Sequence, residues 1–253
     1  MQAYQLLKNN LKLLNLNTIN NIFAAEAEKA LKDSINYIDY LNVLVQAEIE
    51  DKQQRSINYK IRNAKFPCLK TIDSFDFSFQ PSINEKQFKK LTQLEFIEKT
   101  ENILLLGPPG VGKTHLAIAI GLKVCDARIR TIYLTAEQLM NELVIAQYNK
   151  QLQQTIEKYT RFPLMIIDEL GFLPIDKQIA NLLFQLISRK YEQSSIIVTS
   201  NKPLKQWGEI FNDDIIAAAI VDRLVHHSHI FRIDGKSFRA KQKLEQKQLN
   251  NLP

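Results

Sequence analysis

The sequence has few of the residues that mark several common classes of protein. It contains two cysteines, Cys68 and Cys125, and they form no CxxC pair. We therefore expect neither a disulfide nor a cysteine-ligated zinc site, and we interpret both thiols as reduced and largely buried. Glycine is scarce, at 7 residues, which excludes collagen-like and linker-dominated sequences.

Long apolar runs are also missing. No run approaches the roughly 18 residues needed to span a bilayer. The first residues are apolar only at intervals and are interrupted by Lys8 and Lys12, so no continuous signal-peptide core is present. We expect a cytoplasmic protein with no membrane association. Apolar residues still make up 45% of the sequence, which is enough to bury a core.

Positive charge is concentrated in two stretches of a chain whose net charge is +6. Residues 236–247 hold five basic residues against one acidic residue. The basic residues of the first stretch are Lys52, Arg55, Lys60, Arg62, Lys65 and Lys70, with no acidic residue between them. A basic stretch can simply be a solvated helix face, and that interpretation stays open. The alternative is that Lys52, Arg55, Lys60, Arg62 and Lys65 contact DNA phosphates.

The first 66 residues are predicted to form a small all-helical domain. Apolar residues recur at helical spacing, for example Ile38, Leu41, Val45 and Ile49. An asparagine-rich break is expected at 15–21, and Asp33-Ser34 is a plausible helix start. Residues 68–82 hold alternating phenylalanines and turn residues, so we expect an extended connector. The second domain, 67–253, follows.

From residue 102 onward, short apolar runs alternate with helical patterns. This alternation predicts an α/β fold with a five-stranded parallel sheet that is covered by helices on both faces. The predicted strands are 102–106, 131–134, 164–167, 195–199 and 230–233. The predicted helices are 114–126, 136–159 in two pieces, and 177–191.

A complete GxxxxGK[ST] motif follows the first predicted strand and opens the next helix. Its residues are Gly107, Pro108, Pro109, Gly110, Val111, Gly112, Lys113 and Thr114. The glycines allow backbone N–H groups to surround a β-phosphate, and the helix directs its positive end at the same group. Lys113 can reach the β- and γ-phosphates of ATP, and Thr114 can ligate Mg²⁺.

Two acidic residues end the third predicted strand. Asp168 and Glu169 follow four apolar residues, so both carboxylates are expected at the edge of the sheet where ligands bind. Asp168 would hold Mg²⁺ through water, and Glu169 would orient the attacking water for ATP hydrolysis. A small-molecule P-loop kinase would not need the second acid.

Two further polar positions have open interpretations. Asn201 ends the fourth predicted strand and could hold water or sense the γ-phosphate, but Thr-Ser-Asn is also ordinary turn chemistry. Arg223 follows an apolar helical run and precedes the last strand, near one end of the sheet and away from the strand of the P-loop. It either pairs with Asp222 or reaches the nucleotide of a neighbouring subunit.

A histidine group near the end of the chain is predicted to be a surface turn. His226, His227 and His229 have no cysteine or carboxylate at ligand spacing except Asp222. A metal site there is therefore disfavoured.

The motifs together resemble the IstB-like insertion-sequence helper ATPases and, more loosely, the DnaC-type helicase loaders. The matching segments are Ala64–Pro67, Phe75–Phe77, the P-loop with His115-Leu116, Ile167–Gly171, Thr199–Asn201, Asp222–Leu224 and Gly235–Arg239. The resemblance implies an AAA+ fold that binds ATP, with Arg223 as an arginine finger. It also implies that His115 and Arg239 contribute to the nucleotide site. About 20 residues follow Ile233, so a several-helix lid is expected to be reduced or absent.

The resemblance also implies partners. These are double-stranded DNA, a transposase, and further copies of the chain in a ring or a helical filament. A replicative helicase loader has the same ATPase but a protein as its main target. The two alternatives predict different N-terminal surfaces, because a helicase-binding module should present an apolar face and a DNA-binding module a basic one.

Overall fold

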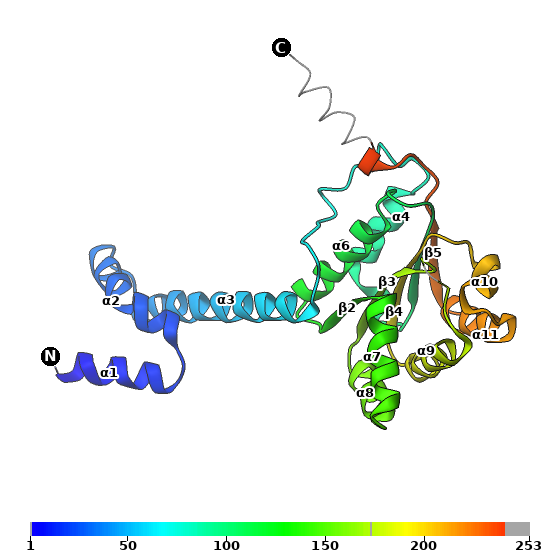
Figure 1. Ribbon diagram of the computed structural model, residues 1–253. Helices are drawn as coiled ribbons and strands as arrows, with labels where there is room; N and C mark the ends of the chain where they lie inside the picture. The colour runs from blue at the N-terminus through cyan, green and yellow to red at the C-terminus, as the bar shows by residue number, and fades with distance from the viewer. Residues whose placement is uncertain (1, 173, 241–253) are drawn as a thin grey trace, which may run out of the picture. The chain divides into compact units, whose positions relative to one another are not determined.

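The structure is a computed structural model, and it describes residues 2–172 and 174–240 (Figure 1). The chain divides into two compact units after Tyr59. The first unit holds α1 (Gln2–Leu13), α2 (Asn17–Lys32) and most of α3 (Tyr37–Ala64), which continues into the second unit. Its small core is formed by Leu11, Ile19, Phe23 and Leu44. The structure therefore has the expected helical N-terminal part.

Two local predictions for these helices are wrong. The break after α1 is shorter than expected, because α2 already begins at Asn17. The buried carboxylate of Glu48 accepts the N–H groups of Thr18 and Ile19 at 2.8 and 3.0 Å, and so satisfies the start of α2 from a distant part of the sequence. The second error is Asp33, which ends α2 instead of starting α3.

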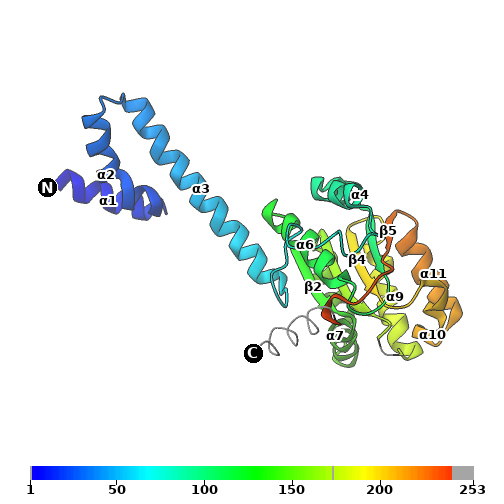
Figure 2. The same ribbon diagram turned by 90° about the horizontal axis from the view of Figure 1, so that it is seen from above.

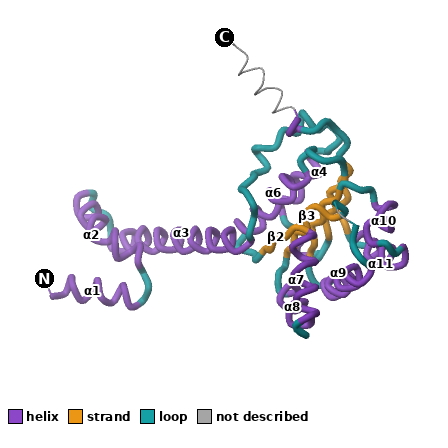
Figure 3. Tube along the Cα trace, in the orientation of Figure 1, coloured by secondary structure: helices purple, strands orange, loops and turns teal. Residues whose placement is uncertain are grey.

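The connector at 68–82 is a loop (Figure 3), but it differs from the prediction because residues 72–82 fold into successive turns and are not extended. The N–H of Phe75 donates to the carbonyl of Ile72, and the N–H of Gln80 donates to that of Phe77. Two short helices that sequence reasoning missed follow the connector, α4 (Glu85–Lys90) and α5 (Glu95–Glu98).

The described residues of the second unit form the predicted five-stranded sheet. Its strands are β1 (Asn102–Leu106), β2 (Thr131–Thr135), β3 (Leu164–Leu170), β4 (Ser195–Ser200) and β5 (Ser228–Arg232). All neighbouring strands are parallel, and the order is β2-β3-β4-β1-β5. The carboxyl ends of β1, β3 and β4 therefore lie side by side, which brings their following loops to one edge.

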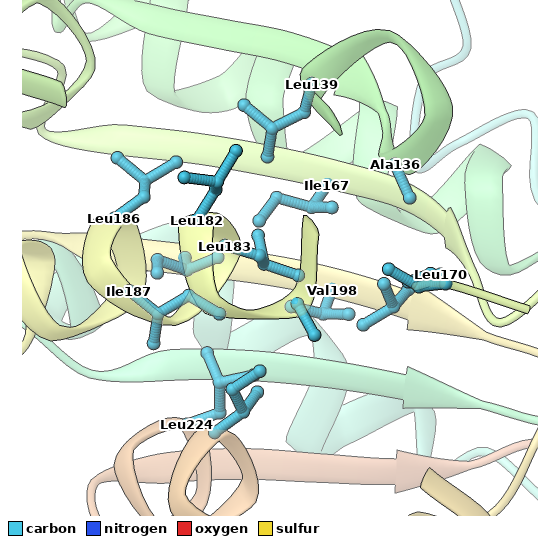
Figure 4. Packing of buried hydrophobic residues seen from close by; sticks show 14 of the residues in the cluster. Ala136, Leu139, Ile167, Leu170, Leu182, Leu183, Leu186, Ile187, Val198 and Leu224 are labelled. Atoms are coloured by element: carbon cyan, nitrogen blue, oxygen red, sulfur yellow. The ribbon is translucent and has the colours of Figure 1, made fainter. Parts of the chain in front are cut away.

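Helices cover both faces of this sheet, as Figures 1 and 2 show. Along β1, Ile103 and Leu105 pack on one side with α6 (Lys113–Asp126), whereas Leu104 and Leu106 face the other. The helices of this second side are α7 (Ala136–Tyr148), α8 (Leu152–Thr160), α9 (Lys177–Lys190), α10 (Trp207–Phe211) and α11 (Asp214–Val225). In Figure 4, Leu183 of α9 lies among Ile167 and Val198 of the sheet. Because both faces of β1 are covered, its consecutive residues Ile103 to Leu106 are all apolar and buried.

Candidate nucleotide-binding site

The P-loop occupies the turn between β1 and α6. Gly110 and Gly112 have φ angles of +81° and +102°, in the region that favours glycine. A Cβ atom at Gly112 would lie 2.5 Å from the ring of Phe75, so a larger residue would have to displace the connector. The loop thus has the open backbone that close approach to phosphates requires.

The Lys113 side chain is held against the loop. Its Nζ donates to the carbonyl oxygens of Gly107 and Pro108, at 2.7 and 2.8 Å. Burial lowers the pKa of the Lys113 ammonium, while the nearby Asp168 carboxylate opposes this shift and Arg239 adds to it. Phosphate oxygens could replace the two carbonyls as acceptors, because the ammonium already lies at the mouth of the loop.

The two acidic residues of β3 have different environments. Asp168 is buried, and its carboxylate accepts hydrogen bonds from the hydroxyl of Thr114 at 3.0 and 2.9 Å. Glu169 is exposed and has a φ angle of +62°. The hydroxyl and carboxylate of the Thr114–Asp168 pair are hard oxygen ligands of the kind that Mg²⁺ prefers, and the exposed Glu169 side chain is accessible to water.

A cavity of about 450 Å³ brings most of the predicted residues together. Predicted residues that line it are Pro109, Gly110, Val111, Gly112, Lys113, Thr114, His115, Glu169, Asn201 and Arg239. Three predicted residues do not line the cavity but bond residues that do. Asp168 accepts a hydrogen bond from Thr114, and the carbonyl oxygens of Gly107 and Pro108 accept hydrogen bonds from Lys113. The carbonyl oxygen of the Asn201 side chain is buried and has no hydrogen-bond partner among the described residues, so it is ready to accept one from a bound water.

The connector forms one wall of the cavity, a role that the sequence did not reveal. Ser74, Phe75 and Phe79 line the cavity. The Nε2 atom of His115 lies 2.8 Å from the carbonyl oxygen of Thr71. Burial lowers the pKa of His115, although its bond to Thr71 opposes this. Cys68 also lies on this wall and is exposed, so the expectation of two buried thiols is wrong for it.

The segment after β5 forms a second wall. The N–H of Phe238 donates to the carbonyl of Gly110 at 2.9 Å, inside the P-loop. The Gln80 amide donates to the carbonyl of Lys236 at 3.0 Å, which joins this segment to the connector across 156 positions. This docking explains how Arg239 lines the cavity.

Arg223 lies apart from this cavity, near the carboxyl end of α11. Its guanidinium carbon is 4.7 Å from the centre of the Phe184 ring, and its Nη1 donates to the carbonyl of Ala219 at 3.0 Å. No ion pair joins Arg223 to Asp222 in the part of the chain that the structure describes. The Asn102 amide bonds the carbonyl of Leu224, so this region lies at the beginning of β1, opposite the P-loop end.

The position of the last strand corrects one expectation. Arg223 was expected near one end of the sheet and away from the strand of the P-loop, but β5, the edge strand that follows it, pairs directly with β1, the strand of the P-loop. Arg223 is therefore separated from the P-loop along the strand direction and not across the sheet.

The candidate DNA contacts differ in their surroundings. Lys52 pairs with Glu48 at 3.6 Å, and Arg55 pairs with Glu48 at the same distance and with Asp51. Arg62 and Lys65 are exposed, and Lys60 is half-buried. Of the second basic stretch, residues 241–247 lie outside the described residues. The ion pairs of Lys52 and Arg55 make these two residues weaker candidates for phosphate contact.

His226 and His227 form a turn before β5, as predicted, whereas His229 lies within β5. A carboxylate also joins the turn. Glu192 lies 3.6 Å from His227 and 4.0 Å from His226, so the expectation that only Asp222 accompanies the histidines is wrong. His229 instead pairs with Glu101 at 2.8 Å. Glu192, His226 and His227 are all exposed.

The parallel sheet, its strand order, the P-loop after β1 and the acidic pair on β3 define a P-loop ATP-binding fold of the AAA+ class. Solved structures support this fold. The chain resembles DnaI, with a TM-score of 0.54 and 18% identity over 65% of this chain and 90% of the other. It also resembles AMPPCP-bound DnaA from Aquifex aeolicus, with a TM-score of 0.55 and 20% identity over 72% and 56%.

Within this class, the chain belongs to the family of IstB-like ATP binding proteins, whose model matches residues 9–246. It is 44% identical to a protein of insertion sequence IS5376 from Geobacillus stearothermophilus, over 91% of this chain and 92% of the relative. It is 43% identical to a protein of insertion sequence IS21 from Pseudomonas aeruginosa, over 85% and 82%. No helix within the described ranges is long and apolar enough to cross a membrane.

Proposed function

We propose that this chain is a Mg²⁺-dependent ATPase that assembles on double-stranded DNA and assists the transposase of an insertion sequence. The observation that carries the ATPase is the gathering of Lys113, Thr114, Glu169 and Asn201 around one cavity. ATP binding alone would not need an exposed carboxylate and a neutral amide beside the phosphate-binding loop. Water activation does need them.

Each residue has a defined role in this proposal. Lys113 exchanges its carbonyl acceptors for β- and γ-phosphate oxygens, and the N–H groups of the P-loop bind the same phosphates. Thr114 and Asp168 would hold Mg²⁺, which when bound neutralises charge on the phosphates. Glu169 accepts a proton from the attacking water, and Asn201 orients that water. Arg239 contributes positive charge from the second wall of the cavity.

Arg223 is proposed to act on the nucleotide of a neighbouring copy. It does not line its own cavity, and no carboxylate pairs with it among the described residues, so its charge is available to a partner. An arginine finger stabilises the charge that develops on the γ-phosphate in the transition state. This role requires a homo-oligomer, as a ring or a filament, because a monomer would lack the finger.

The role in transposition is supported by the relatives, which are proteins of insertion sequences. A specific observation favours a protein as a second target. Ile38, Leu41, Val45 and Ile49 of α3 are between 41% and 73% exposed, so the first unit presents apolar side chains as well as basic ones. An apolar face suits a protein partner. In the proposed function this partner is the transposase, and the second candidate is a replicative helicase, as in a helicase loader.

The ATPase is tested with two variants and two matched controls. Lys113→Ala should abolish ATP binding, and Glu169→Gln should retain binding but lose hydrolysis. Lys123→Ala, on the exposed side of the same helix, and Glu157→Gln, at an exposed position of α8, should behave as the parent. Binding is measured by calorimetry and hydrolysis by phosphate release with Mg²⁺ and DNA. Hydrolysis by Glu169→Gln at the parent rate would refute the role of Glu169.

The DNA and partner roles are tested by imaging and by binding. Negative-stain images of the protein with long DNA and a non-hydrolysable ATP analogue should show rings or filaments on DNA. Purified transposase should bind the assembled protein more tightly than replicative helicase does. A complex that forms with helicase, and does not form on DNA alone, would instead support the helicase loader.

A further inference from the structure

The carboxylate of Asp168 accepts hydrogen bonds from three hydroxyl groups on different elements. Thr114 is in the first turn of α6, Tyr133 is on β2, and Thr199 is on β4. Asp168, Tyr133 and Thr199 are between 1% and 5% exposed, so water does not compete with these bonds. Thr114 belongs to the P-loop motif, but the other two hydroxyl groups have no role in the function proposed above.

The three hydrogen bonds restrain the orientation of the carboxylate to different extents. The Thr114 hydroxyl lies 3.0 Å from one oxygen and 2.9 Å from the other, so it does not select a rotation of the carboxylate. Tyr133 donates to Oδ2 at 2.6 Å, and Thr199 donates to Oδ1 at 2.5 Å. These two bonds approach opposite oxygens, and together they fix the plane in which the carboxylate lone pairs point.

Packing holds the Tyr133 phenol in position to donate to Asp168. The edge of the Phe66 ring packs on Tyr133, with the ring centres 6.2 Å apart, which limits rotation of the tyrosine side chain.

Thr199 links the two acidic residues. Its hydroxyl has one hydrogen, which it donates to Asp168, and its oxygen accepts the backbone N–H of Glu169 at 2.9 Å. Glu169 has a φ angle of +62°, a conformation that costs a non-glycine residue about 1 kcal/mol or more and persists only where the surroundings impose it. The bond from Glu169 to Thr199 is one such restraint, and it sets the direction in which the glutamate side chain leaves the strand.

We propose that Tyr133 and Thr199 are positioning residues of the ATPase. Tyr133 and Thr199 orient the Asp168 carboxylate toward the cation. Thr199 also fixes the position of Glu169 relative to Asp168. The inference rests on the proposed function. It predicts that the cation site and the water-activating glutamate are mechanically coupled through one hydroxyl group, so a change at Thr199 disturbs both whereas a change at Tyr133 disturbs mainly the cation site.

The test removes each hydroxyl with the smallest change in shape. Tyr133→Phe should raise the Mg²⁺ concentration for half-maximal activity about tenfold, because it removes one hydrogen bond to a charged group. Thr199→Val should raise that concentration similarly and also lower kcat by about a further tenfold or more. ATP affinity without Mg²⁺ should stay at the parent value in both. Thr199→Ser keeps the hydroxyl and should restore most of the activity.

Two controls separate positioning from general damage to the core. Tyr159→Phe removes a buried tyrosine hydroxyl that bonds Glu142 far from the site, and Thr131→Val removes a buried threonine hydroxyl at the start of β2. Both should leave the Mg²⁺ dependence unchanged. If Tyr133→Phe and Thr199→Val shift this dependence no more than the controls do, the inference is wrong.

The readout also distinguishes this inference from the proposed function. Mg²⁺ dependence is measured for nucleotide binding by calorimetry as well as for hydrolysis. A parent protein that binds MgATP without hydrolysing it would refute the ATPase, yet the binding titrations of Tyr133→Phe and Thr199→Val would still decide the orientation of Asp168. An unchanged Mg²⁺ titration in both variants would overturn the inference even if the parent is an active ATPase.

Discussion

A buried lysine allows a quantitative test of how the second unit is stabilised. Lys190, near the carboxyl end of α9, is fully buried. Its ammonium donates to the carbonyl oxygens of Tyr159 and Phe162, at 3.2 and 2.9 Å. No carboxylate pairs with it within the described ranges. Burial lowers its pKa from 10.5 to about 7.

The sign of the pH dependence follows from this shift. Below pH 7 the lysine is protonated in both the folded and the unfolded state, and its full burial penalty destabilises the fold. Between pH 7 and 10.5 the unfolded state binds more protons, so the free energy of unfolding rises with pH. The slope approaches about 1.4 kcal/mol per pH unit, which amounts to a gain of about 2 kcal/mol between pH 7 and 9.

Lys190→Met should remove this gain. The substitution keeps an unbranched side chain but leaves two carbonyl groups without their donor, which costs about 1–3 kcal/mol at every pH. The stability of the parent relative to the variant should therefore increase by about 2 kcal/mol from pH 7 to 9.

Urea unfolding followed by the fluorescence of Trp207 measures this difference. Trp207 is the one tryptophan of the sequence and is buried in the second unit. Lys123→Met, at an exposed position of α6, is the control and should parallel the parent. If the Lys190→Met and parent curves also stay parallel from pH 7 to 9, Lys190 does not change its protonation on unfolding and the argument fails.

Two further predictions concern assembly and DNA. Arg223→Ala and Lys113→Ala should each be inactive but recover ATPase activity when mixed on DNA, with a maximum at intermediate ratios, whereas Arg189→Ala should behave as the parent. A mixture that assembles on DNA and stays inactive would exclude a finger that acts between subunits. Replacing Lys60, Arg62 and Lys65 by glutamine should lower the slope of log affinity against log salt by up to about 3, since each phosphate contact contributes about 0.9. An unchanged slope would place the DNA contacts elsewhere, for instance on the segment that holds Lys150, Lys158 and Arg161.

The sheet and the P-loop could be predicted because their signals are local. Each of β1, β3 and β4 contains a continuous apolar run, and the expected ends of β1 match the structure. The expected start of β3 also matches, but the strand continues to Leu170 through both acidic residues. Local patterns failed where a distant residue determines the structure. The start of α2 depends on Glu48, 30 positions from Thr18. The asparagines around this start predicted a break and gave no sign of that distant contact.

The walls of the cavity could not be predicted for a similar reason. The connector has the composition of an extended segment, yet its phenylalanines turn inward to pack with one another and around the P-loop, as the 4.8 Å between the rings of Phe75 and Phe77 shows. The contacts of the Tyr133 and Thr199 hydroxyl groups with Asp168 could not be predicted from the sequence either. Both residues are ordinary strand formers, and only the neighbouring positions of β2, β3 and β4 bring them to Asp168.

The docking of Phe238 onto Gly110 has a consequence for how the protein is made. During synthesis the P-loop, the acidic pair and the connector all leave the ribosome before the segment after β5. That segment bonds the P-loop through Phe238 and the connector through Lys236, so the nucleotide cavity gains its second wall last. A chain interrupted before residue 234 would contain the P-loop and the acidic pair of β3 and still lack that wall. Nucleotide retention would thus distinguish chains that include this segment from chains that lack it.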